Sequence, residues 1–475
     1  MKKLFVTGLL VALAATAALA ATADDGTAQE KEVKKGWSFG VLPCATYSND
    51  MGFQYGAFGD VYYYGDGKTY PDPLHKISWE VSHFTKGRTR YYLAYDSKYL
   101  IPNLRVTGSA TYITDPLYNF WGFNGPASPY YSALVSNKNF NLNEYNALDV
   151  VNFTAMGIPG SFGTQAISYY HMKRNMLRLL ADFQYKLTPN LRLAGGVSFW
   201  RFDIGDLNSE KYGYNPQATV YKHYIQYGLI EEKEKNGGNR LELKAGLVFD
   251  NRDIEAAPNK GIWSEVYVNG SPDVFGDGYN YLKLCAHWRQ YISIPLGFKV
   301  GDPVFAYHLA YQGTIAGNTP FYVQQNITAL VLKQMVSEGL GSSNTIRGTF
   351  TNRIIADGYA WGNFELRVKL VNFKLFGQYF YVATNPFFDC GIVTQPYRLD
   401  KMATLPDVAA AAATAGYKSA SEYLKAKTSE FVKTAGIGLK LAWNQNFIIS
   451  VEGAHNFNKG LGDPFWLSIG VNYAF

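Results

Sequence analysis

Apolar and polar side chains alternate most clearly at the end of the chain, in residues 465–475. Odd positions carry apolar or aromatic side chains, and even positions carry small or polar ones, with Trp466 as the exception. A period of two predicts a β-strand with one apolar face. The length of this strand suits a tilted strand that crosses a bilayer, which needs about 9–11 residues.

The same alternation, interrupted by turn signals, recurs from Gly36 onward and predicts sixteen strands. Their approximate ranges are 37–48, 51–64, 76–86, 89–98, 103–115, 168–187, 190–204, 241–250, 262–271, 279–294, 303–316, 358–371, 374–391, 431–445, 446–458 and 465–475. An even number of strands suits a closed antiparallel barrel. The long connections all fall at one end of such a barrel: 116–167, 205–240, 317–357 and 392–430. The other end receives tight turns, at 188–190, 370–374 and 444–446.

The polar faces of the predicted strands carry charge. In residues 360–370, Glu365, Arg367 and Lys369 alternate with apolar side chains. Because Lys or Arg facing lipid at mid-bilayer costs about 2–4 kcal/mol each, this face is expected to line a lumen. An open sheet is excluded, since lipid offers no partner for a free sheet edge. We therefore predict an all-β fold in which residues 36–475 form a 16-stranded antiparallel transmembrane β-barrel.

The N-terminus predicts export. Lys2 and Lys3 precede an apolar run and a small-residue cleavage site, so residues 1–23 are interpreted as a secretory signal peptide. Residues 24–35 are charged and predict a flexible periplasmic tail. Beyond the signal, no apolar stretch reaches the roughly 18 residues that a membrane helix requires.

Composition agrees with a membrane barrel. Tyrosine (37) outnumbers phenylalanine (30), glycine is abundant (46), and only 17% of residues are charged. A soluble domain has about 25% charged residues, and barrels with aromatic girdles are rich in tyrosine. A secreted β-sandwich protein has a similar composition and remains an alternative.

Candidate chemistry is sparse. Removing the two lysines of the signal lowers the formal net charge from +6 to about +4, which is too small to indicate nucleic-acid binding. Three cysteines and seven histidines form neither a disulfide framework nor a metal-ligand pattern. We expect no catalytic residue, no metal site and no cofactor. The aromatic segment 118–125 could bind a sugar or a partner, but we interpret it as an interfacial girdle joined to loop packing.

Four motifs in about residues 241–475 resemble the BamA/TamA family of outer-membrane assembly and translocation proteins, also called bacterial surface antigens. They are Phe249-Asp-Asn-Arg-Asp253 with Pro258-Asn-Lys-Gly261, Gly339-Leu-Gly341 with Ile346-Arg347-Gly348, Asn363-Phe-Glu365-Leu-Arg367, and Phe387-Phe-Asp389-Cys-Gly391. The resemblance implies a barrel with long extracellular loops, the sixth of which folds back into the lumen.

The resemblance also implies that Arg347, in the loop motif Ile346-Arg347-Gly348, docks against acidic residues of the barrel wall. The alternation places Glu365 and Asp389 on lumenal faces, where a guanidinium can form charge-assisted bonds with both. Gly348 lets the backbone turn close to the wall. The alternative is that Arg347 is a solvated loop charge.

The terminal strand resembles the C-terminal assembly signal of Gram-negative outer-membrane barrels, with Tyr473 and Phe475 as its aromatic positions. Two departures from the BamA/TamA pattern weaken the transfer of insertase activity. Thr349 replaces the family's aromatic residue, with Phe350 one place later, which puts the packing of the loop tip in doubt. The family's repeated periplasmic domains are not found before the first predicted strand.

We expect an integral protein of the Gram-negative outer membrane, with both termini in the periplasm, that assists insertion or translocation of protein or lipid. Its expected partners are outer-membrane lipid and a periplasmic or outer-membrane protein, but no nucleic acid. The expected mechanism is a weakened junction between the first and sixteenth strands that opens laterally. A passive diffusion channel and a structural or surface-loop binding barrel remain alternatives.

Overall fold

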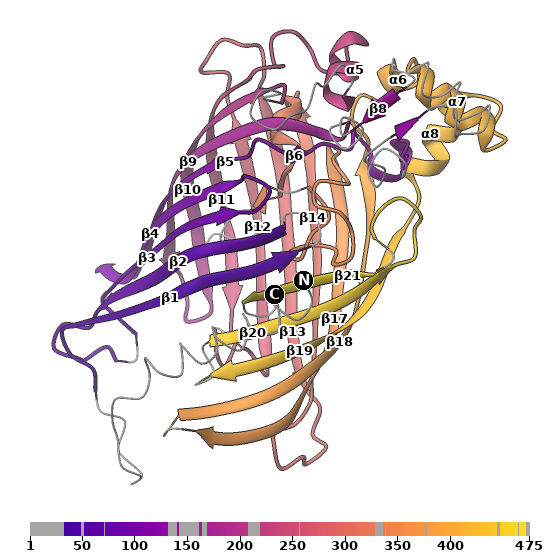
Figure 1. Ribbon diagram of the computed structural model, residues 1–475. Coiled ribbons are helices and arrows are strands. Elements are labelled where there is room, and N and C mark those ends of the chain that lie inside the picture. The colour runs from indigo at the N-terminus through magenta and orange to yellow at the C-terminus, as the bar shows by residue number, and fades with distance from the viewer. Residues whose placement is uncertain are drawn as a thin grey trace.

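A computed structural model describes the chain at residues 33–48, 52–70, 72–131, 140–141, 161–163, 169–207, 219–255, 257–327, 336–337, 339–375, 378–443, 447–463 and 465–471. Within these residues, sixteen long strands form a closed antiparallel barrel (Figure 1). They are β1 (Trp37–Ser48), β2 (Gly52–Tyr63), β3 (His75–Phe84), β4 (Thr89–Ile101), β5 (Leu104–Thr114), β9 (His171–Lys186), β10 (Leu191–Gly205), β11 (Gly237–Asp250), β12 (Gly261–Ser271), β13 (Tyr281–Ser293), β14 (Val304–Gly317), β17 (Gly358–Leu375), β18 (Gln378–Gln395), β19 (Val432–Trp443), β20 (Phe447–Asn456) and β21 (Trp466–Val471). The predicted 16-stranded fold is confirmed.

Consecutive strands pair antiparallel around the barrel, and β1 meets β21 to close it. The β1–β2 register is continuous over twelve pairs, from Trp37 with Tyr63 to Ser48 with Gly52. Across the closing seam, the paired positions within the described residues are Tyr47 with Ile469 and Ser48 with Ser468. Within the described residues, the seam is therefore paired over a shorter length than the neighbouring β1–β2 hairpin.

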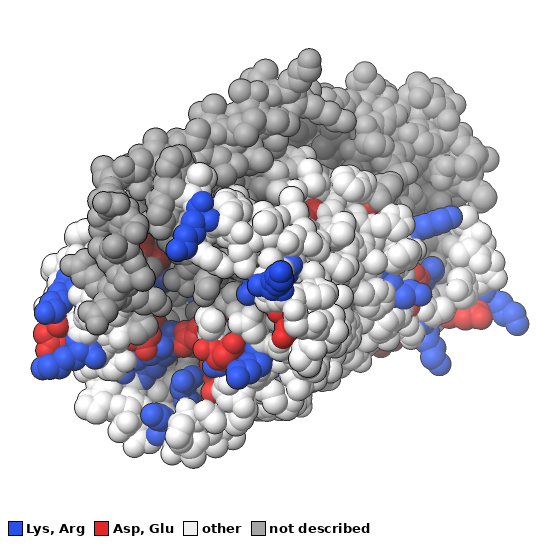
Figure 2. Space-filling view, turned by 90° about the horizontal axis from the view of Figure 1, so that it is seen from below, with Lys and Arg blue, Asp and Glu red and all other residues white. Residues whose placement is uncertain are grey.

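The two faces of the wall differ as the alternation predicts. On β17, Leu366 and Leu370 point outward and are exposed, whereas Glu365 and Arg367 point into the lumen and are buried. Trp466, the exception in the last strand, also points inward and packs with Phe387 and Ala454. Figure 2 views the molecule from below and shows acidic and basic side chains gathered in a hollow, beside a flank with little charge.

The four longest connections lie at one end of the barrel, called the loop end here, and the opposite end is called the turn end (Figure 1). The loop end carries short strands β6 (Tyr118–Asn119), β7 (Phe140–Asn141), β8 (Ser161–Gly163), β15 (Asn326–Ile327) and β16 (Val336–Ser337). It also carries the 3-10 turns η1 (Gly125–Ala127) and η4 (Phe321–Val323), and helices α5 (Val220–Gln226), α6 (Leu399–Met402), α7 (Pro406–Thr414) and α8 (Ala420–Thr428). Helices α6, α7 and α8 all lie in the connection between β18 and β19.

Aromatic side chains from several of these connections form one buried cluster, called the cap. Its members include Phe120, Trp121, Tyr224, Phe321, Phe350 and Tyr397. Burial of large aromatic side chains stabilises such a cluster strongly, because each removes about 150–250 Å² of surface from water. The 118–125 segment therefore belongs to the interior of the cap. The predicted loop packing is confirmed, and the prediction that the segment contributes to an interfacial girdle is wrong.

One predicted turn is also wrong. Residues 370–374 are not a connection, because β17 continues to Leu375 and pairs there with Gln378 at the start of β18. A register shift between Lys369 and Val371 lets the strand continue past the point where the simple alternation ends. Such a bulge adds one residue to a strand without ending its pairing.

Some predictions fall outside the described residues. These are the signal peptide 1–23, most of the 24–35 tail, the 444–446 turn, and the assembly-signal residues Tyr473 and Phe475. No helix in the described part of the chain combines the length and apolarity needed to cross a membrane.

Candidate functional site

The connection between β14 and β17 folds into the lumen and is called the plug loop; its described residues are 318–327, 336–337 and 339–357. Arg347 lies in this loop with no exposed surface. Gly348 follows with φ of +84°, and a Cβ there would lie 3.0 Å from the Cβ of Ala454 on β20. A glycine is favoured at this position both by the left-handed backbone and by the close approach to the wall. Ile346 packs in a second buried cluster with Leu340 and Trp361.

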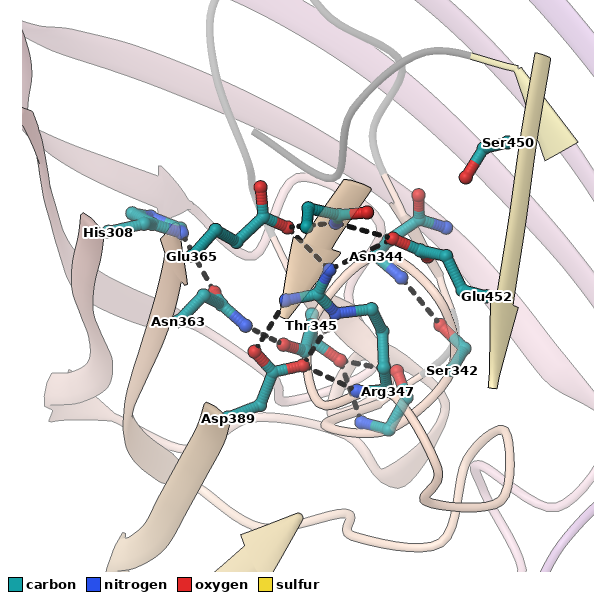
Figure 3. Close-up of polar contacts among 12 residues, drawn as sticks. His308, Ser342, Asn344, Thr345, Arg347, Asn363, Glu365, Asp389, Ser450 and Glu452 are labelled. Carbon is teal, nitrogen blue, oxygen red and sulfur yellow. Dashed lines mark hydrogen bonds and ion pairs between the residues drawn. The ribbon is translucent and has the colours of Figure 1, made fainter. Parts of the chain in front are cut away.

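Arg347 is bound to Asp389 on β18 through three nitrogen atoms. Its Nε and its backbone N–H donate to Oδ2 at 2.8 and 3.0 Å, and its NH2 group donates to Oδ1 at 2.8 Å (Figure 3). The guanidinium also lies 3.6 Å from the ring centroid of Phe387, on the same strand. A planar fork across both carboxylate oxygens fixes orientation as well as distance.

Two further carboxylates contact the same guanidinium. Nη1 of Arg347 lies 2.5 Å from Glu365 Oε1 on β17 and 3.1 Å from Glu452 Oε1 on β20 (Figure 3). Asn385 Nδ2 donates to both of these oxygens, at 3.3 and 3.1 Å. Three wall strands thus converge on one loop side chain.

Two wall cations balance the remaining charge. Arg367 Nε lies 3.0 Å from Glu365 Oε2, and Lys440 Nζ on β19 lies 2.8 Å from Glu452 Oε1. With Arg347 and Asp389, the site contains three cationic and three anionic side chains and is neutral overall. A buried ion cluster needs such pairing, because an uncompensated charge in this environment is very costly.

The carboxylates determine the protonation of the loop arginine. Burial alone would lower the pKa of Arg347, but the charges of Asp389, Glu365 and Glu452 outweigh burial and hold that pKa well above its ordinary value. The guanidinium therefore stays charged at physiological pH.

A second set of hydrogen bonds holds the backbone before Arg347. Asn363 Nδ2 on β17 donates to the carbonyl of Thr345 at 2.5 Å, and Asn363 Oδ1 lies 3.1 Å from His308 Nδ1 on β14 (Figure 3). His308 Nε2 lies 3.1 Å from His287 Nδ1 on β13. Both histidines face the lumen, and they bond with each other and with the wall. Within the described residues, no group of three or more His, Cys, Asp or Glu side chains is placed to hold a metal ion.

Thr349 and Phe350, where the loop motif departs from the BamA/TamA pattern, lie between the barrel wall and the cap. Phe350 stacks on Trp121, with ring centroids 5.0 Å apart and planes 15° apart. Thr349 accepts a hydrogen bond from Asn456 Nδ2 on β20 at 3.0 Å. Shifting the aromatic residue by one position therefore moves its packing to the 118–125 segment, and leaves a small polar residue against the wall.

Arg353 fastens the same loop to two other loop-end connections. Its guanidinium donates to the carbonyls of Gly125 and Ser128 at 2.8 and 3.0 Å, and to that of Gly460 at 2.8 Å. These bonds satisfy a fully buried guanidinium through backbone dipoles. The plug loop thus uses Arg347 to bind the barrel wall and Arg353 to bind the cap.

The structure brings together Arg347 of the loop and Glu365 and Asp389 of the wall. These are the three residues through which the sequence predicted docking of the loop. Sequence reasoning missed Glu452 and Lys440. Both lie on lumenal faces of their strands, so the alternation in residues 431–445 and 446–458 contained a signal for them. The arrangement of charges at this site immobilises the loop against the barrel wall.

Comparison with known proteins identifies the fold. Residues 135–448, about two thirds of the chain, match the Omp85 superfamily domain. BamA from Haemophilus ducreyi, in a structure lacking POTRA domains 1–3, shares 15% identity, with a TM-score of 0.51 over 92% of this chain and 70% of that one. CdiB from Escherichia coli shares 9% identity, with a TM-score of 0.53 over 94% of this chain and 64% of that one. No curated protein matches the chain in a sequence search.

At these identities the structural likeness shows the fold alone, and the chain spans less than two thirds of the length of the CdiB protein. The superfamily match covers the plug loop and the wall strands that supply Asp389 and Glu365. It confirms the BamA/TamA resemblance at the level of superfamily and barrel. The chain therefore belongs to the Omp85 superfamily of outer-membrane β-barrel proteins.

Proposed function

We propose that this barrel assists the insertion or translocation of polypeptide or lipid at the outer membrane by opening the seam between β1 and β21. The observation that carries the proposal is the short pairing at this seam among the residues that the structure describes. Described pairs join Tyr47 with Ile469 and Ser48 with Ser468, whereas β1 pairs with β2 along its whole length. A strand held firmly on one side and weakly on the other is the natural place for a barrel to open.

The outer face of β1 supports the same proposal. Its side chains Trp37, Phe39 and Val41 are 61%, 70% and 59% exposed, which places them among the most exposed large apolar side chains of the described residues. Apolar side chains beside a weakly paired strand can interact with acyl chains or with an incoming amphipathic strand. Either interaction would stabilise an open seam.

We infer the orientation from the lengths of the connections. In the proposed arrangement, the loop end with its cap faces outward and the turn end faces the periplasm, so both termini are periplasmic. Residues 1–23 act as the export signal, and the protein carries out no catalysis. A periplasmic protein partner delivers the client to the turn end.

A passive diffusion channel has less support, because Arg347 holds the plug loop inside the lumen against wall residues Glu365, Asp389 and Glu452. A surface-binding barrel also has less support, since Trp121 and its neighbours in the 118–125 segment are buried in the cap. A partner would therefore find few of these aromatic side chains free to bind.

A reversible disulfide bond across the seam, the seam staple, tests whether seam opening is required. Replacing Tyr47 and Ile469 by Cys joins β1 to β21 under oxidising conditions, because directly opposed strand residues are close enough for a disulfide. The matched control replaces Ala45 and Tyr55, an outward-facing pair that joins β1 to β2. We expect the seam staple to impair growth and lower outer-membrane protein or lipid content, with recovery in reductant. Equal effects of both staples, or of neither, would refute seam opening.

Depletion and purification test the cellular role. Loss of the protein should change the protein or lipid content of the outer membrane, measured by quantitative mass spectrometry of isolated membranes. Purification in mild detergent should recover a periplasmic or outer-membrane partner. An unchanged membrane after complete depletion would exclude the assembly role.

A further inference from the structure

The connection between β11 and β12 crosses the lumen near the turn end. We call its described residues, 251–255 and 257–260, the strap. Glu255 Oε1 lies 3.1 Å from Lys98 Nζ on β4 and 3.6 Å from Arg105 NH1 on β5. On the other side, Ala257 packs against a cluster of wall residues from β18, β19 and β20, which are Tyr381, Ala383, Ala442 and Ile448.

Strand order shows what these contacts mean. β4 and β5 are the fourth and fifth strands of the barrel, whereas β18 to β20 are the thirteenth to fifteenth. The strap leaves the wall between the eighth and ninth strands and contacts both of these distant arcs. A segment that touches both arcs must span the lumen rather than extend away from the barrel.

The strap is internally braced. Arg252 forms a fork with Asp250 through two bonds of 2.9 Å, and its NH1 donates to the carbonyl of Glu255 at 3.0 Å. Asp253 accepts bonds from the backbone N–H groups of Asn259 and Lys260, at 3.0 and 3.3 Å. These bonds use residues of the Phe249–Asp253 and Pro258–Gly261 motifs, which the plug-loop site leaves without a role. They hold the strap in a defined shape.

The ionic contacts at the tip of the strap form a latch on the wall. Lys98 also binds Asp72 at 3.2 Å, and Arg105 forks onto Asp96 with bonds of 2.8 and 2.7 Å, so both cations are positioned before Glu255 reaches them. Burial raises the pKa of Glu255, but the charges of Arg105 and Lys98 outweigh burial and lower that pKa to about 2. The carboxylate is therefore ionised throughout the physiological range.

The other side of the strap is closely packed. The cavity between the strap and β14, β17 and β18 has a volume of about 40 Å³. This volume accommodates only a few water molecules. The strap therefore lies close against this part of the wall.

We propose that the strap is a second gate, which closes the turn end of the lumen in series with the plug loop and is latched by Glu255 on Lys98 and Arg105. The two gates are built from different connections and bind different arcs of the wall. Release of one leaves the other in place. The lumen becomes continuous only when both are displaced.

Conductance of the purified full-length protein in planar bilayers tests the series arrangement. The variants are Glu255→Gln, Arg347→Ala and the two combined. We expect the double variant to conduct more than the sum of the increases in the two single variants, because each single variant keeps one barrier. Glu232→Gln is the matched control, since it removes the same charge from an exposed pair with Lys235 at the loop end. Additive increases, or a double variant as closed as wild type, would overturn the proposal.

Cysteine labelling tests the latch without relying on conduction. Ala257→Cys is introduced where the native Cys44, Cys285 and Cys390 are replaced by Ser, and labelling with a membrane-impermeant maleimide is timed. We expect slow labelling that accelerates when Glu255→Gln is added. Equal rates with and without Glu255 would show that the latch does not hold the strap. Heat-modifiable migration in gels confirms that each variant is a folded barrel, and neither assay depends on the proposed assembly role.

Discussion

Removing Arg347 should release the plug loop, and the size of the effect follows from the charges left behind. In Arg347→Ala, the carboxylates of Glu365 and Glu452 keep Arg367 and Lys440 as partners. Asp389 is different, because each ion pair described for it involves Arg347. The variant therefore leaves the fully buried carboxylate of Asp389 without the cation that pairs with it.

Breaking a buried ion pair by deleting one partner costs about 3–5 kcal/mol. At about 1.4 kcal/mol per tenfold change, the docking equilibrium of the plug loop should shift by roughly two to three and a half orders of magnitude. Adding Asp389→Asn removes the stranded charge, so the Arg347→Ala/Asp389→Asn variant should recover a large part of this loss. Arg347→Lys keeps the charge but loses the fork across Asp389, and should fall between wild type and Arg347→Ala.

The assay is protease protection of the plug loop in detergent-solubilised barrels, combined with the midpoint temperature of heat-modifiable migration. We expect cleavage to be fastest in Arg347→Ala and slower in the double variant. The reasoning would be refuted if Arg347→Ala resisted protease as well as wild type does. It would equally be refuted if Asp389→Asn gave no recovery in the double variant, since the cost would then not come from the stranded carboxylate.

The remaining predictions concern the loop tip and the cap. Gly348→Ala should loosen the plug by about 1 kcal/mol or more, because it places a Cβ at positive φ against the wall, and faster proteolysis would report it. Phe350→Ala should destabilise the cap by about 3–5 kcal/mol through loss of its stack on Trp121, which tryptophan fluorescence and thermal denaturation would detect. Arg353→Met removes the donors to the carbonyls of Gly125, Ser128 and Gly460 and should lower the unfolding temperature of the cap without opening the wall site, a separation that loop-specific proteolysis can measure. Burial raises the pKa of Glu231, but Arg398 and Lys401 outweigh it and lower that pKa, so its contribution is present above the unfolded value near pH 4.3 and is lost as pH falls below it. Pepsin should therefore cut the loop end of the wild type faster as pH falls. The rate of cleavage should depend less on pH in Glu231→Gln, which lacks the ionisable carboxylate.

The barrel was predictable because its main constraint is local. A side chain faces lipid or lumen according to the parity of its position, so Glu365 and Asp389 could be assigned to the lumen one strand at a time. Parity gives no depth along the barrel axis, which depends on the register between strands. Glu452 was missed for this reason, since its approach to Arg347 depends on the register that joins β17 to β20.

Irregular pairing also limited the prediction. The shift between Lys369 and Val371 is a local distortion that leaves no clear sequence signal, and it turned an expected connection into strand. Contacts within the cap were even harder to predict from the sequence. Trp121 donates to the carbonyl of Thr351, 230 positions away, and no pattern within either segment specifies the other.

The stack of Phe350 on Trp121 has a consequence for exchanging parts among related barrels. Two connections far apart in sequence have been matched to each other, so neither is an independent module. A chimera that receives the β14–β17 connection alone should carry an orphaned ring and a hole in the recipient's surface loops. Transplanting the 118–125 segment with it should restore a protease-resistant exterior, which makes the pair, rather than either loop, the unit to exchange.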